Sequence, residues 1–313
     1  MDLMHRPTGE RDLAECLAIL QDGFSYPNAL RERLPAIAAR LLAEGAMNSA
    51  VLEDMDQPAG QRLLQFGASV FLSDAFVREA EAGMMPHLSV QVVAAIIKGR
   101  SPVLTLPEIR AANARDGLNL FILHFGLALD RVNPADLPAL FARIPESFFS
   151  LHLGFNLKQI IVEFCDDAVV RFSLASGFRL RTDYAAFYGR HGLPPPGCRP
   201  YRLGVTREEA AESPGAYISR LFPFQRPQFC FTHGEQQLLQ RALQGDTDAE
   251  ASGALCIAVP TVKTRWRTIY DRVGARTPGL LPAGGVGRAA RGSEKRRLLL
   301  NYLRQHPEEL RPF

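Results

Sequence analysis

Histidines, cysteines and paired carboxylates are the residues from which a catalytic centre could be built, and in this chain they are scattered. His87, His124 and His152 each stand among apolar neighbours, where a histidine is more often a hydrogen-bonded core residue than a base or ligand. No H-x-x-x-H or H-E-x-x-H spacing and no nucleophile-elbow sequence occurs. Asp166 and Asp167 suit a helix start better than a catalytic dyad. We therefore predict no catalytic residue, no metal site and no cofactor.

The cysteines and the apolar runs indicate where the protein works. There are five cysteines, an odd number without any C-x-x-C spacing, which favours neither a zinc site nor a disulfide framework. A reducing cytoplasm suits such a chain. The most apolar run, residues 118–129, is too short to span a bilayer, and the start of the chain does not read as a signal peptide. We predict a cytoplasmic protein with no membrane partner.

A basic stretch over residues 260–273 gives a clearer indication of function, namely binding to a partner molecule. Its apolar residues recur at helical spacing, so that one stripe can be buried while cationic and short polar side chains face outwards. Such a helix suits the DNA major groove, where long cations reach guanine edges and phosphates. We predict that double-stranded DNA is contacted by the following residues: Lys263 and Arg267 at bases or phosphates, Thr264 at base edges, and Thr261 and Arg272 at the backbone.

Two shorter helices are predicted to precede this basic helix. Thr232 and Glu235 have the spacing at which a hydroxyl and a carboxylate cap the exposed amides of a helix start. Gly245 suits the end of that helix, and Thr247 begins a second helix that extends to Leu255. With the basic helix, these elements predict an all-α helix-turn-helix domain.

The same segment is similar to a known family in its ordered residues. The string that carries the likeness is Gly245, Thr247, Glu250, Leu255, Ile257, Thr261, Val262, Lys263, Ile269, Tyr270 and Val273. It resembles the LuxR-type helix-turn-helix of bacterial transcription regulators, in which G-x-[ST]-x-x-E precedes a T-V-K recognition helix. The chain departs from the pattern at Ala251, Gly253 and Ala258, where an internal glycine and a missing cap each cost about 1 kcal/mol. These departures imply a module that is marginally stable alone or that binds DNA weakly unless it dimerises.

Residues 1–188 are predicted to form a mixed α/β domain. We expect strands at 5–7, 48–53, 61–72, 118–125, 157–164 and 178–184, and helices at 12–20, 28–44, 75–82, 88–98, 105–116, 135–155 and 167–176. This order resembles the GCN5-related N-acetyltransferase fold, with residues 160–164, Ala168 and the Gly177-Phe178 pair similar to its fifth strand, fourth helix and final turn. That family holds the cofactor pyrophosphate on a glycine-rich Q/R-x-x-G-x-G/A turn. Residues 126–134 hold one glycine and Asp130 instead, which implies a non-catalytic sensing or dimerising domain.

The remaining residues divide by composition and charge. A Gly- and Pro-rich stretch predicts a linker at 189–230, followed by the DNA-binding domain at 231–313. Residues 231–313 hold 13 Lys or Arg against 8 Asp or Glu, a net of +5, so that residues 1–230 carry 3 − 5 = −2. An extra helix at 293–310 begins with Lys295, Arg296 and Arg297, which either touch phosphate or form a solvated face.

These observations together predict a bacterial transcription regulator that is not an enzyme. Its N-terminal domain would be acetyltransferase-like and would sense an unknown small-molecule effector or mediate homodimerisation, and its C-terminal domain would bind DNA. The alternative is an acyl-CoA-dependent N-acetyltransferase that carries a DNA-binding appendage. A third hypothesis is that the helical module mediates protein contacts alone.

Overall fold

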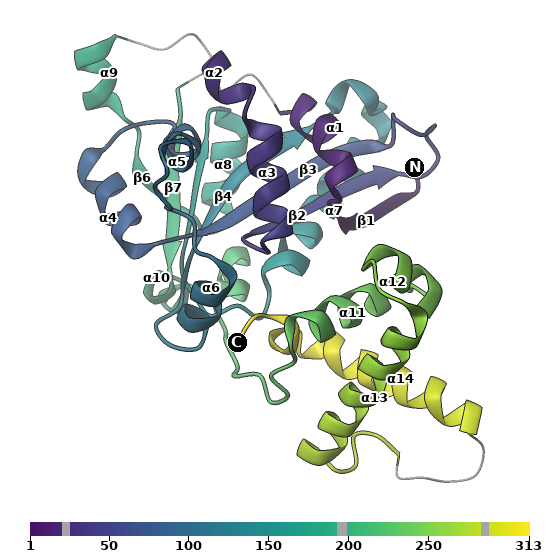
Figure 1. Cartoon of the computed structure of the whole chain (residues 1–313). Helices are drawn as coiled ribbons and strands as arrows, with labels where there is room; N and C mark the ends of the chain where they lie inside the picture. The colour runs from purple at the N-terminus through teal and green to yellow at the C-terminus, as the bar shows by residue number, and fades with distance from the viewer. Residues whose placement is uncertain (21–25, 193–198, 283–287) are drawn as a thin grey trace. The chain divides into compact units, whose positions relative to one another are not determined.

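The computed structural model describes residues 1–20, 26–192, 199–282 and 288–313, with the backbone alone at 288–291. The described chain divides into two compact units, both drawn in Figure 1. The N-terminal unit comprises Met1–His152 and Asn156–Pro223, and the C-terminal unit comprises Leu153–Phe155 and Phe224–Phe313. The boundary at Pro223 falls inside the predicted linker, of which residues 193–198 lie outside the described residues.

A seven-stranded mixed sheet in the order β1-β2-β3-β4-β5-β7-β6 forms the centre of the N-terminal unit. Neighbouring strands are antiparallel except for β4 and β5, which run parallel. The strands are β1 (Leu3–Pro7), β2 (Met47–Asp54), β3 (Leu63–Leu72), β4 (Leu118–Leu127), β5 (Leu157–Phe164), β6 (Arg179–Thr182) and β7 (Tyr201–Thr206). The predicted fold class of this region, a mixed α/β sheet with helices, is confirmed.

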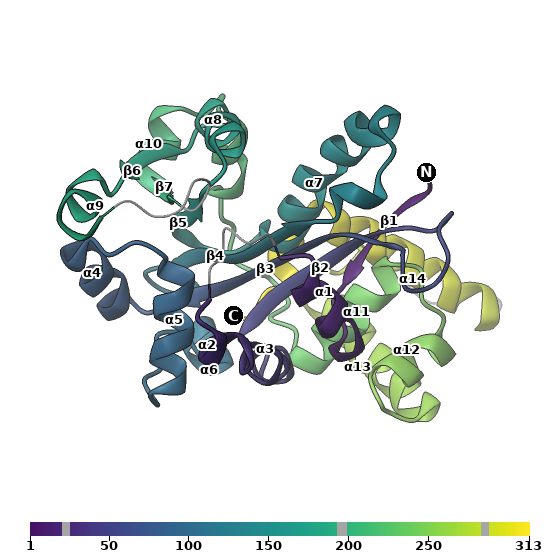
Figure 2. The same ribbon diagram turned by 90° about the horizontal axis from the view of Figure 1, so that it is seen from above.

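Helices cover both faces of this sheet. They are α1 (Leu13–Ala18), α2 (Asn28–Arg31), α3 (Leu34–Ala43), α4 (Asp74–Gly83), α5 (Leu88–Ile97), α6 (Leu106–Asn113), α7 (Leu137–His152), α8 (Asp167–Ala175), α9 (Ala185–His191) and α10 (Arg207–Glu212). In Figure 2, α1, α3 and α5 lie on one face, and α7 and α8 lie on the other. Because β4 is covered on both faces, nearly all of its residues are apolar, as predicted.

The larger hydrophobic core lies on the face of the sheet under α1, α3, α4 and α5. Successive side chains of a strand point to opposite faces. In β3, the residues Phe66, Ala68, Val70 and Leu72 belong to this core. The alternate residues Gln65, Gly67 and Ser69 therefore face α7 and α8, where they line a cavity.

β7 is one of the elements that were not predicted from the sequence. It lies within the predicted linker, pairs with β5 from Gln159↔Thr206 to Phe164↔Tyr201, and holds the edge strand β6. The flanking glycines and prolines obscure a strand of six residues, and its partner is far upstream, where no local pattern could reveal it. The linker predicted at 189–230 is thus in large part folded structure, including α10, which begins with a capping box between Thr206 and Glu209.

The C-terminal unit is built from α11 (His233–Leu243), α12 (Asp248–Ala254), α13 (Val259–Arg276) and α14 (Arg288–Gln305), followed by a short 3-10 helix, Pro307–Leu310. The predicted capping box of Thr232 and Glu235 forms, and Thr247, which was predicted to begin the next helix, forms one with Glu250. Gly245 ends α11 in a left-handed conformation, with φ of +98°. α14 begins before the predicted start of the final helix and ends before its predicted end. Across the described ranges, no helix is long and apolar enough to cross a membrane.

Candidate functional site

The parallel strands β4 and β5 separate part of the way along their length. They pair from Leu118↔Leu157 to Phe121↔Ile161, and beyond that point β4 pairs with β3 and β5 pairs with β7. A bulge in β4 lies next to the point of separation, where Ser69 pairs with Ile122 and Ala68 pairs with His124. Leu123 is the extra residue, and a bulge of this kind bends a strand and increases its twist. The sheet therefore opens between β4 and β5.

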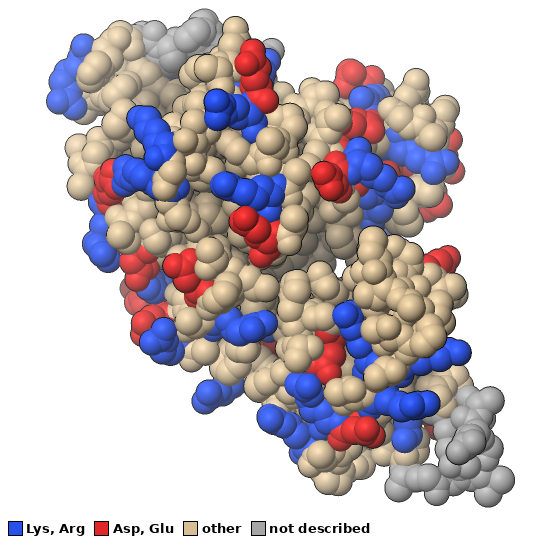
Figure 3. Space-filling model, viewed as in Figure 1, with Lys and Arg blue, Asp and Glu red and all other residues tan. Residues whose placement is uncertain are grey.

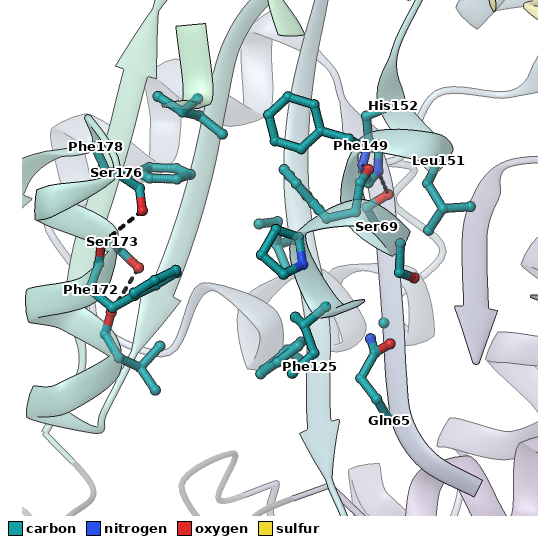
Figure 4. A pocket seen from close by; sticks show the side chains of 18 of the residues that line it. Gln65, Ser69, Phe125, Phe149, Leu151, His152, Phe172, Ser173, Ser176 and Phe178 are labelled. Carbon is teal, nitrogen blue, oxygen red and sulfur yellow. Dashed lines mark hydrogen bonds between the residues drawn. The ribbon is translucent and has the colours of Figure 1, made fainter. Parts of the chain in front are cut away.

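A cavity of about 160 Å³ lies over this opening, between α7 and α8 (Figure 4). Its lining is almost entirely apolar and is rich in aromatic rings, which are those of Phe125, Phe148, Phe149, Phe164, Phe172, Phe178 and Tyr217. The rings of Phe125 from β4 and Phe164 from β5 meet edge to face with centroids 6.4 Å apart. A cleft with these walls suits an apolar chain, since burying that chain removes apolar surface from water.

Gln65 is one of the few polar residues that line the cavity. Its side chain is 4% exposed, and no donor in the described ranges lies within hydrogen-bond distance of its Oε1. An unsatisfied buried acceptor costs about 1–3 kcal/mol, which a ligand N–H or O–H would recover. Gly67 lies beside it on the same face of β3, where a Cβ would approach Gln65 Nε2 to 2.9 Å. The site thus combines apolar walls with one acceptor that lacks a donor.

Ser69 and His152 form the second polar feature of the cavity wall (Figure 4). Ser69 Oγ lies 2.7 Å from His152 Nε2, and His152 Nδ1 lies 2.7 Å from the carbonyl oxygen of Phe148. A carbonyl can only accept, so Nδ1 carries the proton and Nε2 accepts from the Ser69 hydroxyl. His152 was correctly predicted to be a hydrogen-bonded core residue. Ser69 was missed, because it lies 83 residues from its partner and no local motif marks it.

His124 and His87 also have hydrogen-bond partners, as predicted for isolated histidines. Tyr26 Oη lies 2.7 Å from His124 Nε2, and Tyr188 Oη lies 3.4 Å from His87 Nε2. Burial lowers the pKa of His124 to about 4 and also lowers the pKa of His87. Both imidazoles are therefore neutral at pH 7. Within the described residues, no group of His, Cys, Asp and Glu is arranged to hold a metal ion.

A buried ion pair lies on the other face of the sheet, at the end of β5. Glu163 accepts hydrogen bonds from Arg202 Nε at 3.2 Å, from the backbone N–H of Leu88 at 2.5 Å, and from the hydroxyl of Tyr184. Arg202 also donates to the carbonyl oxygens of Ala80 and Met85. Both charged side chains are about 5% exposed. These bonds tie α4 and α5 to the strands that border the opening.

The turn between β4 and α7 does not fit a nucleotide diphosphate. Arg131 donates to Glu15 at 2.6 Å and to the carbonyl oxygen of Leu63, so its charge is already paired. The N–H of Asp136 donates to the carbonyl oxygen of Asn133, within the turn itself. Gly126 is required for packing, since a Cβ there would lie 2.7 Å from the carbonyl oxygen of Ile19. Arg131, the N–H of Asp136 and Gly126 are thus all engaged within the protein.

The five residues predicted to contact DNA lie on α13, and four of them are on the side opposite its buried stripe. Thr261, Lys263, Thr264 and Arg267 are exposed. Arg272 is half-buried and is held by the carbonyl oxygen of Cys230 at 2.8 Å and by Glu235 at 3.1 Å, so it does not join this exposed row. Figure 3 shows Lys and Arg side chains gathered over the part of the C-terminal unit where α13 and α14 run. The contacts with DNA stay a prediction.

Arg296, in the basic cluster that begins the final helix, also has a structural role. Its guanidinium stacks over the ring of Trp266 at 4.7 Å from the centroid. It donates to Asp248 Oδ1 at 2.9 Å and to the carbonyl oxygen of Asp246 at 2.8 Å. Arg296 therefore links α14 to α12 and α13. Of the three basic residues, Lys295, Arg296 and Arg297, only Arg297 is exposed.

No protein-family model and no curated protein matches the chain. Among solved structures, it is similar to mutant forms of the spermidine/spermine N-acetyltransferase of Vibrio cholerae, with a TM-score of 0.37, 12% identity, and coverage of 70% of this chain and 99% of that one. The manganese complex of that enzyme gives a TM-score of 0.35 at 12% identity, covering 67% and 95%. Its dodecameric form gives 0.34 at 12% identity, covering 65% and 93%.

These neighbours correct the main functional prediction from the sequence. All of those reported are N-acetyltransferases, so the prediction of a transcription regulator that is not an enzyme is contradicted. The LuxR-like residues are a strong local pattern, but they occupy one short segment. The larger unit has neither a glycine-rich turn nor a catalytic motif that a local pattern would reveal. Neighbours this distant define at most a shared layout, and the chemistry must come from the cleft itself.

Proposed function

We propose that the N-terminal unit is an acyltransferase that holds the acyl chain of a thioester in the apolar cleft and passes it to an amine. The observation that carries this proposal is the opening between β4 and β5 under an aromatic-lined cavity. An opening of this kind admits an extended chain between two parallel strands. The apolar walls would keep water from the thioester and so favour transfer to an amine over hydrolysis.

The reaction consists of an amine attack on the thioester carbonyl, cleavage of the C–S bond, and release of a thiol and an amide. Within the cleft, Gln65 Oε1 would accept an N–H from the donor, because it is buried without a partner in the described structure. The turn that follows β4 offers no seat for a nucleotide diphosphate. The donor is therefore recognised by its acyl chain and the adjoining amide-bearing arm.

Thiol release provides a direct test. Decanoyl, hexanoyl and acetyl thioesters of N-acetylcysteamine are incubated with the full chain and a panel of amines, including spermidine, and free thiol and amide are measured. We expect amine-dependent thiol release that increases with acyl length, because the walls are apolar. Absence of both thioester binding by calorimetry and thiol release would exclude the proposal.

A charge at the mouth of the cleft should weaken donor binding. Phe172 lines the cavity from α8 and is 62% exposed, so Phe172→Glu should fold normally and place a carboxylate against the acyl chain. We expect at least about a tenfold rise in Kd for the decanoyl thioester, since a carboxylate beside an apolar chain replaces favourable burial with desolvation. The matched control is Phe141→Glu on α7, which is 49% exposed and does not line the cavity. Equal effects of the two variants would contradict the assigned site.

We also propose that the C-terminal unit is a LuxR-type helix-turn-helix appendage that binds double-stranded DNA, as part of a homodimer in the cytoplasm. The exposed row of Lys263, Thr264 and Arg267 supports this, since the opposite stripe of α13 is buried. Lys263→Ala and Arg267→Ala should each flatten the slope of log K against log salt by about 0.9 per lost phosphate contact. Fluorescence anisotropy with duplex DNA measures this slope, and Arg304→Ala on α14 is the control. An unchanged slope in both α13 variants would show that Lys263 and Arg267 do not contact phosphate.

A further inference from the structure

We propose that Ser69 and His152 are a nucleophile and its base, and that the acyl group passes through an ester on Ser69 Oγ before it reaches the amine. This inference rests on the proposed acyltransferase function and adds a covalent intermediate to it. Both residues line the cavity, and their side chains meet in its wall as Figure 4 shows. Their low exposure, 2% for Ser69 and 1% for His152, reflects their place on an enclosed surface.

The geometry fixes the direction of proton transfer. His152 Nδ1 donates to the carbonyl oxygen of Phe148 at 2.7 Å, which leaves Nε2 as the acceptor, 2.7 Å from Ser69 Oγ. A serine hydroxyl becomes a useful nucleophile when an oriented base can take its proton. Here the base is held by a backbone carbonyl four residues earlier in the same helix. The pair thus has the arrangement that nucleophilic catalysis requires.

Two other serines in the same cavity show how a merely structural hydroxyl behaves. Ser173 donates to the carbonyl oxygen of Val169 at 2.8 Å, and Ser176 donates to that of Phe172 at 2.9 Å. These are bonds to the preceding helical turn, the ordinary arrangement for a serine at such a position. Ser69 lies instead on a strand, at the bulge where β4 leaves β5, and its hydroxyl meets an imidazole.

The first step transfers the acyl group to the protein. Ser69 Oγ attacks the thioester carbonyl carbon while its proton passes to His152 Nε2. The resulting tetrahedral intermediate collapses with cleavage of the C–S bond, and the leaving sulfur takes the proton from the imidazolium. The products are one free thiol and one Ser69 ester, with His152 neutral again.

The second step regenerates the serine. A neutral amine attacks the ester carbonyl carbon, and His152 Nε2 accepts a proton from the nitrogen. The ester C–O bond then breaks and the proton returns to Ser69 Oγ. One amide is released, so that the sum of the two steps is thioester plus amine giving amide plus thiol, without any oxidant or reductant.

Intact-mass spectrometry of the full chain tests the intermediate. The protein is mixed with the decanoyl thioester of N-acetylcysteamine without amine, acid-quenched at short times, and mapped by peptide digestion. We expect a mass increase of one decanoyl group in place of one hydrogen, located at Ser69 and discharged when amine is added. Ser69→Ala should carry no adduct, and His152→Gln should form it at least about 100-fold more slowly, which is the usual contribution of a general base.

Matched variants separate this inference from the proposed function. Ser176→Ala removes a hydroxyl from the same cavity and should acylate like the wild type. Ser69→Cys keeps a nucleophile of similar size and should trap a hydroxylamine-sensitive thioester, even if Ser69→Ala proves too unstable to assay. Amide formation by wild type without any Ser69 adduct, or at an unchanged rate in folded Ser69→Ala, would overturn the inference and leave the acyltransferase intact. Failure of thiol release altogether would instead remove the proposed function.

Discussion

Replacing Arg202 by methionine should lower the free energy of unfolding by about 3–5 kcal/mol, because it leaves the Glu163 carboxylate buried without its cation. Both side chains of this pair are about 5% exposed, and Arg202 Nε lies 3.2 Å from Glu163 Oε1. Two backbone carbonyls would also lose their donor, since Arg202 binds Ala80 and Met85. Urea unfolding followed by circular dichroism measures the loss.

The neighbouring sheet edge supplies the control for this change. Arg179 pairs with Glu209 and Glu212, but its side chain is 45% exposed. An exposed pair contributes about 0–1 kcal/mol, so Arg179→Met should cost little. In Arg202→Met/Glu163→Gln, removal of the unpaired charge should recover part of the loss. A cost below about 1 kcal/mol for Arg202→Met alone would show that water reaches Glu163.

The pair of Glu163 and Arg202 shows which parts of the fold could be predicted from the sequence. The strands β4 and β5 and the helix α5 were predicted closely, because long apolar runs and helical spacing are local signals. The contact between Glu163 and Arg202 depends on β7, which lies inside the predicted linker. Because β7 is defined by pairing with β5 and β6, its discovery required the tertiary structure.

The cleft was beyond the reach of the sequence for a similar reason. Phe125, Phe164 and Phe172 look like ordinary core residues in a linear chain, and the opening between β4 and β5 follows from a bulge at Leu123 that no motif announces. The missing glycine-rich turn implied a non-catalytic domain. That turn bears on phosphate binding, whereas the apolar cavity can form without it.

Capping was the most reliable signal in the C-terminal unit. The capping box predicted at Thr232 and the helix start predicted at Thr247 are both found, because the hydroxyl and carboxylate need only their own helix turn. Arg272 was predicted to contact the DNA backbone, but its side chain is half-buried. Its partners are Cys230, which lies before α11, and Glu235 in the first turn of α11, so its charge links α13 to the start of the unit.

Acid should destabilise the protein through His124, because this residue binds a proton more readily in the unfolded state than in the folded state. The imidazole is wholly buried beside Tyr26 and Phe66, and burial lowers its pKa to about 4 in the folded state, against 6.5 in the unfolded chain. Above pH 6.5 neither state is protonated at this residue, so it contributes no pH dependence. Between pH 6.5 and pH 4 His124 is protonated in the unfolded chain but not in the folded state. The free energy of unfolding therefore falls as the pH falls.

The expected loss from His124 between pH 7 and pH 4.5 is about 2–3 kcal/mol, at roughly 1.4 kcal/mol for each pH unit below 6.5. Carboxylates whose pKa values are lowered, such as Asp74 and Glu209, also lose their contribution as acid is added. Those groups titrate equally in His124→Gln, which keeps an acceptor for Tyr26. The difference between wild type and His124→Gln in urea unfolding at the two pH values therefore isolates the histidine. His191→Gln, an exposed site, should follow the wild type, and parallel curves for wild type and His124→Gln would show that His124 is protonated in the folded state.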